Sequence, residues 1–412
     1  MPDSAVFWGM MSALPASPTT YSLFDHLICS ACRQPYTPAV LHTLSPCCHM
    51  PLLAQYTLTG GPDKRILLHR EGTMWRYREV LPVFSAAHQI SLGEGFTPML
   101  GLNRLGAANG FSDLWLKDEG KNPTGSFKAR GLSMAISKAH EYGVEGCIIP
   151  TAGNAGVAMA AYCARAAMQA VVVMPRHTPK AFQEECYWYG ADVHLIDGLI
   201  NDCAAKVRQL NSSGQWLDLS TLKEPYRIEG KKTMGYEIAE QMNWQLPDVI
   251  LYPAGGGTGL IGIWKAFREM QQLGWLPADI RLPRMVAVQA ENCQPLVDTW
   301  LGKQPNAQQY NGKPTLANGL AVPRPIGEPL MLNVLHESRG LTLGISEADM
   351  VDSVREIGKT EGVFLAPEGA ALWTAARQLL RQGWLSATDR VLLLNTGNGQ
   401  KYLDNLRPFL TD

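Results

Sequence analysis

One lysine of the chain stands where a reactive amine is expected. Lys128 follows a predicted strand over residues 114–117 and a turn at residues 123–125, and it opens an apolar helix directly after Phe127. Burial in such a pocket lowers the pKa of a lysine and makes its neutral amine available, as a Schiff base to an aldehyde requires. The alternative is an ordinary lysine at a helix start, whose ammonium reaches water.

A loop of sequence PTAGNAG, at residues 150–156, leaves one predicted strand and opens a helix. The backbone amides around Thr151 and Gly153 could hold a carboxylate at the helix N-terminus. The side-chain amide of Asn154 could hydrogen-bond to an oxygen on a ring. A simple glycine turn with a helix cap would explain the same residues.

A second glycine-rich loop, AGGGTG at residues 254–259, also joins a strand to a helix. Consecutive glycines allow backbone N–H groups to converge on a phosphate. The candidate phosphate ligands are therefore Gly255, Gly256, Gly257 and Thr258. The run matches neither the dinucleotide-binding pattern nor a Walker loop, so it is a weak signal alone.

A hydroxyl follows a further strand in the sequence NTGNG, where Thr396 is the candidate functional residue. A plain turn would account for this stretch as well. The four segments together supply an amine, a carboxylate site, a phosphate site and a hydroxyl. Pyridoxal phosphate has an aldehyde, a phosphate, a phenolic oxygen and a ring nitrogen to be fixed, and these groups match that set.

The elements that must position these loops alternate between strand and helix. Strands are predicted over residues 114–117, 147–149, 170–174, 193–196, 249–252, 285–288 and 391–394, and helices over residues 127–142, 156–167, 179–189, 260–270, 347–360 and 368–380. This alternation predicts an α/β fold with mostly parallel sheets covered by helices on both faces. Ligands of such sheets bind at the carboxyl ends of the strands, where all four loops lie. Residues 276–330, rich in Pro, Asn and Gln, are expected to form long connections.

The composition is that of a globular protein with a small ligand. The chain has 412 residues, 36 Lys and Arg against 37 Asp and Glu, and 46% hydrophobic residues. The length predicts two or three domains, and the even charge balance gives no reason to expect a nucleic-acid or membrane partner. Nine cysteines in so long a chain favour reduced thiols and a cytoplasmic location. The apolar stretch at residues 5–14 lacks the basic flank of a signal peptide.

The order of these motifs resembles that of the threonine synthases, pyridoxal-phosphate enzymes that share the fold of the tryptophan synthase β-subunit. The matching stretches are LGEGFTP (92–98), NPTGSFKARG (122–131), TAGNAG (151–156), PYRIEGKKT (225–233), GGGTG (255–259), VQAENCQPL (288–296), TLANGLAV (315–322), PEGA (367–370) and TGNGQK (396–401). They follow the family order over about residues 90–401.

The resemblance implies a role for each candidate residue. Lys128 would form the Schiff base and act as the general base, Asn154 would meet the 3-hydroxyl of the cofactor, and Thr396 would face its pyridine nitrogen. The glycine loop would bind the cofactor phosphate, and Thr151 with its neighbours would bind the substrate carboxylate. The implied reaction converts O-phosphohomoserine and water to threonine and phosphate. Arg227 is the candidate for the substrate phosphate, and an ion pair between domains is the equal alternative for it.

The resemblance also implies three parts and a homodimer. We expect a ribbon-like N-terminal extension over residues 1–58. A large cofactor-binding domain would be built from residues 59–132 and 216–412, and a small α/β domain from residues 133–215.

Two positions depart from the family pattern. Ala129 stands where threonine synthases commonly have an acidic residue, and Glu224 stands where they tend to have Asn near the substrate phosphate. A serine/threonine dehydratase, a cysteate synthase or a diaminopropionate-type lyase would use the same cofactor site. A binding protein that kept the fold without catalysis is a further alternative.

Four cysteines near the N-terminus resemble the zinc ribbon that precedes some threonine synthases. Cys29, Cys32 and Cys48, with Cys47 or His49, could close a tetrahedral site. However, Ser45 occupies the place of the first cysteine in the second knuckle, and adjacent cysteines strain the geometry. We therefore expect a ribbon that has lost its metal.

Overall fold

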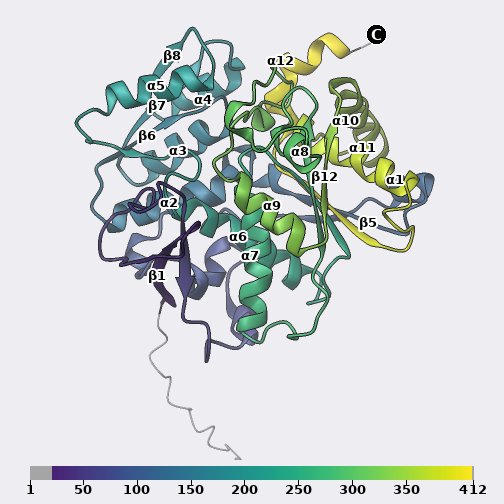
Figure 1. Ribbon diagram of the computed structural model, residues 1–412, viewed down its shortest axis with the longest axis horizontal. Helices are drawn as coiled ribbons and strands as arrows, with labels where there is room; N and C mark the ends of the chain where they lie inside the picture. The colour runs from purple at the N-terminus through teal and green to yellow at the C-terminus, as the bar shows by residue number, and fades with distance from the viewer. Residues whose placement is uncertain (1–20, 411–412) are drawn as a thin grey trace, which may run out of the picture.

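A computed structural model describes residues 21–410, which fold around three sheets (Figure 1). The apolar stretch at residues 5–14 lies outside the described residues. The smallest sheet is antiparallel, with the strand order β2-β1-β3, and comprises β1 (Phe24–Cys29), β2 (Pro35–Tyr36) and β3 (Leu52–Tyr56). It forms the N-terminal extension, at the lower left of Figure 1.

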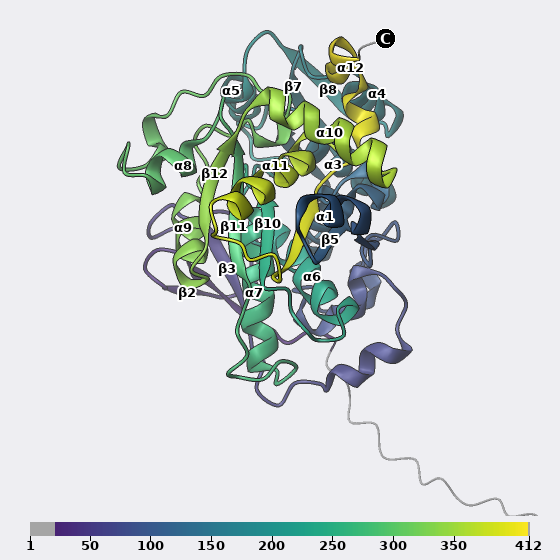
Figure 2. The same cartoon turned by 90° about the vertical axis from the view of Figure 1, so that its right-hand side faces the viewer.

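The largest sheet has six strands in the order β12-β11-β10-β13-β5-β4, all parallel except β4 at the edge. Its strands are β4 (Met99–Gly101), β5 (Asp113–Asp118), β10 (Val249–Pro253), β11 (Arg284–Ala290), β12 (Leu341–Ile345) and β13 (Arg390–Asn395). The helices α10 (Glu347–Glu361) and α11 (Pro367–Arg381) cover one face, and α6 (Tyr226–Gln241) and α7 (Thr258–Gln272) lie on the other side (Figures 1 and 2).

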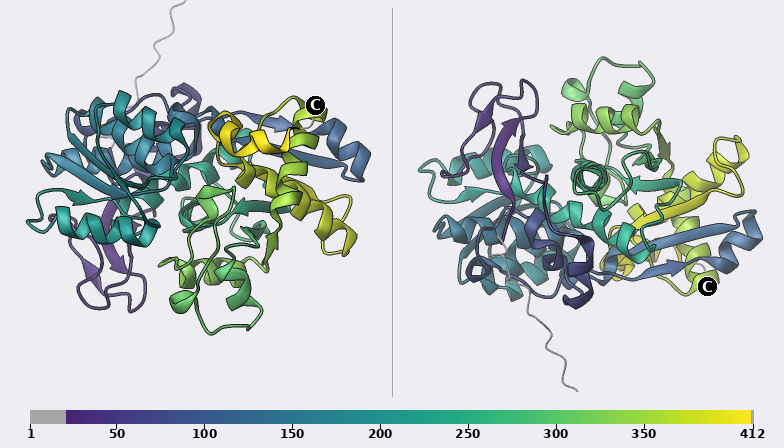
Figure 3. Two further views of the ribbon diagram at one scale, coloured as in Figure 1. Left: turned by 90° about the horizontal axis from the view of Figure 1, so that it is seen from above. Right: turned by 90° about the horizontal axis from the view of Figure 1, so that it is seen from below.

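The second parallel sheet has four strands in the order β8-β7-β6-β9. Its strands are β6 (Gly146–Pro150), β7 (Gln169–Pro175), β8 (Asp192–Ile196) and β9 (Leu217–Asp218). Both faces of this sheet are buried, since Val172 packs in the main core and Val171 packs with Val207 of α5 (Ile200–Leu210) in a separate cluster. Seen from above and below, this sheet and the six-stranded sheet form two adjacent lobes (Figure 3).

The described residues form twelve α-helices. They are α1 (Asn103–Asn109), α2 (Lys128–Glu141), α3 (Asn154–Arg165), α4 (Lys180–Trp188), α5 (Ile200–Leu210), α6 (Tyr226–Gln241), α7 (Thr258–Gln272), α8 (Pro295–Trp300), α9 (Glu328–Glu337), α10 (Glu347–Glu361), α11 (Pro367–Arg381) and α12 (Leu403–Leu406). None of the described helices is both long and apolar enough to cross a membrane.

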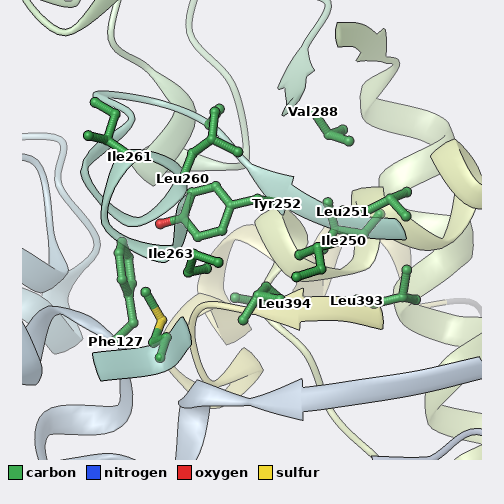
Figure 4. Packing of buried hydrophobic residues seen from close by; sticks show 14 of the residues in the cluster. Phe127, Ile250, Leu251, Tyr252, Leu260, Ile261, Ile263, Val288, Leu393 and Leu394 are labelled. Carbon is green, nitrogen blue, oxygen red and sulfur yellow. The ribbon is translucent and has the colours of Figure 1, made fainter. Parts of the chain in front are cut away.

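The core of the large sheet lies between β10, β13 and the helices that cover them. Figure 4 shows Ile250, Leu251, Leu393 and Leu394 packed side by side, with the ring of Tyr252 reaching toward Phe127. Phe127 and Tyr252 meet edge to face, with their ring centroids 6.2 Å apart. Because Phe127 directly precedes Lys128, the core fixes the start of helix α2 beside the end of strand β10.

The predicted fold class of two mostly parallel sheets with helices on both faces is confirmed, although several elements differ from expectation. The helices after the two glycine loops begin earlier than predicted, at Asn154 and Thr258. Residues 276–330 contain strand β11 and helix α8 as well as loops. Helix α6 was not expected, because its charged residues include Glu229 and Lys232, which nevertheless lie inside the protein as an ion pair.

Candidate active site

Lys128 opens helix α2 and lines a cavity of about 270 Å³ where loops from both parallel sheets meet. Its Nζ lies 4.7 Å from the ring centroid of Phe127. Burial, reinforced by the nearby charge of Arg227, lowers the pKa of Lys128 to about 7, although Glu368 partly opposes this shift. A large share of this lysine is therefore a neutral amine at neutral pH, as a nucleophile or a general base must be.

The loop before Lys128 is joined to the loop that carries Thr396. The backbone N–H of Phe127 donates to the carbonyl of Thr396 at 3.1 Å, and Asn398 donates in the same way to Gly125 at 2.9 Å. Ser126 and Gly397 form an antiparallel bridge. These contacts place the hydroxyl-bearing Thr396 and the amine-bearing Lys128 on neighbouring walls of the cavity.

The glycine loop after β10 has the close packing that a phosphate cradle needs. A Cβ added at Gly255 would lie 2.3 Å from the carbonyl oxygen of Gly319, and one at Gly257 would lie 2.4 Å from Met331. Gly257 adopts φ 79° and caps helix α7 without a side-chain hydrogen bond. The N–H groups at the start of α7 therefore remain available to an anion beside Thr258.

The loop after β6 contributes Thr151, Gly153 and Asn154 to the same cavity. The N–H of Gly153 donates to the hydroxyl of Thr151 at 3.2 Å, which shapes the turn into α3. The Nδ2 of Asn154 donates to the hydroxyl of Tyr402 at 3.4 Å, while its buried Oδ1 has no partner among the described residues. An unpaired buried acceptor at this position suits a ligand that supplies a donor.

Arg227, the predicted ligand of the substrate phosphate, does not line the cavity. Helix α6 buries it, with its side chain 1% exposed, and its guanidinium donates to the carbonyl of Leu219. Its Nε lies 3.8 Å from Oε1 of Glu224, three residues earlier in the same chain segment. The contacts of Arg227 therefore correspond to a local ion pair behind the cavity wall, rather than to an ion pair between domains.

Glu224 is also buried, and its second oxygen accepts from the backbone N–H of Tyr226 at 2.7 Å. Burial raises its pKa to about 7, despite the opposing charge of Arg227. The carboxyl group thus accepts from the first backbone N–H groups of helix α6 and does not line the cavity.

The sequence interpretation missed several polar residues of the cavity wall. Among them are Lys223, Arg324, Glu368 and Tyr402. Lys223 lies in the loop after the short strand β9, which was not predicted, and pairs with Asp218 at 3.0 Å. Glu368 lies within the PEGA stretch that resembles the family, whereas Arg324 and Tyr402 carry no local pattern that distinguishes them from surface residues.

The N-terminal extension holds a second cluster of reactive side chains. The sulfur atoms of Cys29, Cys32, Cys47 and Cys48 all lie within 4.8 Å of one another. A tetrahedral zinc site with Zn–S bonds of about 2.3 Å spaces its sulfur atoms by about 3.8 Å. The sequence favoured a ribbon without metal, but this arrangement favours a metal-binding one with Cys47, rather than His49, as the fourth ligand.

A sequence comparison identifies the family. Residues 90–397 match the family described as pyridoxal-phosphate dependent enzyme. The chain belongs to this family, and pyridoxal phosphate is its cofactor. The match spans the loops that carry Lys128, Asn154, the glycine run and Thr396, and the sequence-based prediction of the cofactor is confirmed.

The names of similar proteins support the resemblance that the sequence motifs indicate. The chain is 32% identical to a threonine synthase of Methanocaldococcus jannaschii, covering 81% of this chain and 82% of that protein. It is 30% identical to a threonine synthase of Methanosarcina acetivorans, covering 90% and 91%. The predicted resemblance to threonine synthases is confirmed.

Solved structures show the same fold in enzymes of different activity. Diaminopropionate ammonia lyase from Escherichia coli superposes with a TM-score of 0.64 at 19% identity, over 80% of this chain and 94% of that one. Maize serine racemase superposes with a TM-score of 0.63 at 20% identity, over 76% and 93%. At these identities the likeness concerns the fold alone.

The residues that line the cavity also match the functional groups of the cofactor. The cavity wall contains Lys128 with its lowered pKa, a helix N-terminus behind closely packed glycines, and the buried amide oxygen of Asn154, which has no partner among the described residues. These groups correspond to the aldehyde, the phosphate and the phenolic hydroxyl of pyridoxal phosphate.

Proposed function

We propose that this protein converts O-phosphohomoserine and water to threonine and phosphate. The observation that carries the proposal is the extra positive charge in the cavity. Lys223, which also pairs with Asp218 at 3.0 Å, and the exposed Arg324 line it from different loops, in addition to the glycine loop assigned to the cofactor. A substrate that brings a second phosphate explains these cations. The similarity to named threonine synthases over four fifths of the chain supports the same substrate.

When bound, the cofactor supplies an electron sink that stabilises negative charge on the carbons of an amino acid. The amine of Lys128 would take and return protons at those carbons. The amides near Thr151 and Gly153 would hold the substrate carboxylate, and Asn154 would orient the cofactor ring. The neutral hydroxyl of Thr396 would face the pyridine nitrogen. Lys223 and Arg324 would hold the substrate phosphate until it leaves.

A second candidate is another elimination or replacement reaction with the same cofactor, such as a dehydratase, a cysteate synthase or a diaminopropionate-type lyase. The observation that favours it is the position of Arg227, which is buried and does not line the cavity, so this arginine does not reach a substrate phosphate there. Ala129, buried in α2, adds no polar group to the cavity.

One assay separates the two candidates. Purified protein with pyridoxal phosphate is given O-phosphohomoserine, O-phosphoserine, threonine and serine in turn. Release of inorganic phosphate together with threonine from O-phosphohomoserine supports the first proposal. Ammonia and 2-oxobutanoate formed from threonine, with no phosphate released from O-phosphohomoserine, would reject it in favour of a dehydratase.

The remaining proposals concern the whole protein. We propose a homodimer in the cytoplasm, and the division into residues 1–58, 59–132 with 216–412, and 133–215 as its three parts. We also propose that the four N-terminal cysteines bind a zinc ion.

A further inference from the structure

The side-chain amide of Asn154 is held by a tyrosine that the proposed reaction leaves without a role. Its Nδ2 donates to the hydroxyl oxygen of Tyr402 at 3.4 Å, and its Oδ1 is buried without a partner among the described residues. Both residues line the active-site cavity. An amide has a donor end and an acceptor end of similar size, so the end that meets a ligand depends on what holds the other end.

The hydroxyl of Tyr402 has its own proton committed elsewhere. It donates to Oε1 of Glu368 at 2.7 Å, and the same oxygen accepts from the backbone N–H of Gly319 at 2.8 Å. The other oxygen of this buried carboxyl group, Oε2, has no partner among the described residues. Burial holds the pKa of Tyr402 well above its usual value, so the phenol keeps its proton. The hydroxyl therefore offers Asn154 a lone pair and no hydrogen.

The ring of Tyr402 is fixed by packing that does not involve its hydroxyl. Tyr402 ends the short helix η8 (Gly399–Tyr402) and is 1% exposed. Its ring meets that of Phe182 from α4 edge to face, with the ring centroids 5.7 Å apart. The Phe182 ring would lie 3.6 Å from a Cβ on Gly153, the residue before Asn154. Aromatic packing thus holds the Tyr402 hydroxyl beside Asn154.

We propose that Tyr402 is a positioning residue that fixes the orientation of the Asn154 amide. With Nδ2 turned to Tyr402, Oδ1 is the end that meets the phenolic oxygen of the cofactor, and it accepts a hydrogen bond from the protonated phenol. The reversed amide would set Oδ1 against the lone pair of Tyr402 and offer an N–H group to a phenolate. Tyr402 therefore favours the protonated phenol over the phenolate. This role rests on the proposed function only in that Asn154 meets the cofactor.

The test compares the absorption spectra of wild type and Tyr402→Phe, each as the full chain with bound pyridoxal phosphate and no substrate, at neutral pH. The bound cofactor has separate absorption bands for its phenol and phenolate forms. Tyr402→Phe keeps the ring that packs on Phe182 but leaves the Asn154 amide free to reverse. We expect the ratio of phenol to phenolate to fall at least about threefold, the effect of one hydrogen bond. The control is Tyr162→Phe, a buried tyrosine of α3 that donates to Glu94 at 2.7 Å and does not line the cavity, and it should keep the ratio.

A double-mutant comparison shows whether Tyr402 acts through Asn154. In an Asn154→Ala background, Tyr402→Phe should leave the band ratio unchanged, because no amide remains to be turned. A tyrosine that only supports the fold would change the ratio in both backgrounds. If Asn154→Ala alone changes the ratio and Tyr402→Phe does not, Asn154 meets the cofactor without help from Tyr402 and the proposal is overturned.

Two variants of Glu368 keep the inference testable if Tyr402→Phe fails to fold. Glu368→Gln and Glu368→Leu both lack the carboxylate charge, but only the glutamine can still accept the hydrogen of Tyr402. In Glu368→Leu the freed hydroxyl can donate to Asn154 and reverse its amide, so this variant should have the lower ratio of phenol to phenolate. Equal ratios in the two variants would overturn the proposal. No measurement uses a substrate, so the result does not depend on which reaction the enzyme catalyses.

Discussion

The amine of Lys128 is the residue on which the chemistry of this fold depends. Its position on the first turn of α2, beside Phe127, gives it an apolar neighbour and a cavity in front. Replacing it should therefore remove the covalent link to the cofactor without removing the glycine loop that holds the phosphate. The cofactor would still bind, but as a free aldehyde.

We expect Lys128→Ala, mixed with excess pyridoxal phosphate, to lack the visible absorbance that an imine gives, while the wild type is yellow. The matched control is Lys121→Ala, an exposed lysine in the preceding loop, which should keep the colour. A colourless wild type after reconstitution would contradict the assignment of the amine.

The pH dependence of cofactor capture should report the depressed pKa of Lys128. Only the neutral amine attacks an aldehyde, and burial places its pKa at about 7, against an ordinary value of 10.5. The rate at which cofactor-free protein gains colour should rise about tenfold per pH unit below pH 7 and level off above it. A rate that still climbs tenfold between about pH 8 and 9 would indicate an ordinary lysine.

At the scale of the elements, the glycine loop before α7 must keep the backbone shape that only glycine accepts without strain. In Gly257→Ala the new Cβ would approach Met331 and the residue would keep φ 79°. We expect at least a tenfold loss of affinity for pyridoxal phosphate, measured by equilibrium titration.

The control for that loss is Gly274→Ala. This glycine also has a positive φ, 70°, but nothing lies within 4 Å of its Cβ position. It carries the same conformational cost of about 1–2 kcal/mol away from the cavity. An equal loss of affinity in both variants would mean that instability, rather than the shape of the phosphate loop, explains the effect.

Three elements around the cavity are held together by a fully buried ion network. Glu237 of α6 accepts from Nζ of Lys117 in β5 at 2.8 Å and pairs with Arg130 of α2. Arg130 in turn binds Glu119 at 2.6 Å. Removing one partner leaves buried cations without compensation, so Glu237→Gln should lower the free energy of unfolding by about 3–5 kcal/mol near neutral pH.

The same network predicts how the difference in the free energy of unfolding between wild type and Glu237→Gln depends on pH. Burial acts to raise the pKa of Glu237. The positive charges of Arg130 and Lys117 outweigh this effect and lower the pKa to about 2, from 4.5. A carboxyl group with a depressed pKa stabilises the fold fully above its unfolded pKa, and this contribution is lost as the pH falls from about 4.5 toward 2. Denaturant unfolding of wild type and Glu237→Gln at pH 7 and pH 3 should show a smaller difference at pH 3, and an equal difference would contradict the assignment.

For the whole molecule, the N-terminal extension should behave as a separate metal-dependent part. We expect the purified protein to contain about one zinc ion per chain, and Cys32→Ser to lose it while keeping the colour of the bound cofactor. His49→Ala should keep the metal, because the cluster consists of four cysteine sulfur atoms and this histidine is not part of it. Metal analysis of the three proteins tests the proposal, and a wild type free of zinc after purification in zinc-supplemented medium would reject it.

Sequence reasoning predicted the strands and loops of the site because apolar runs that end in Gly, Asn and Thr are local signals. Lys128, Asn154 and Thr396 all line the cavity, as expected of residues at strand ends. Helix α6 was not predicted because it has no clear apolar face and buries charged side chains. Several of these charges are neutralised by ion pairs with distant segments, and such pairs cannot be recognised from the sequence of one segment. The unpaired carboxyl of Glu368 depends on α11, on Gly319 and on Tyr402, and only the folded arrangement brings these together.

The place of β13 in the large sheet has a consequence for synthesis on the ribosome. Although β13 is the last strand of the described residues, it lies between β10 and β5, and the loop after it carries Thr396. A nascent chain that has not yet reached residue 390 lacks the strand that joins the two halves of this sheet. Until then the sheet has an open gap between β10 and β5, so the complete cofactor site can form only after residues 390–396 have been synthesised.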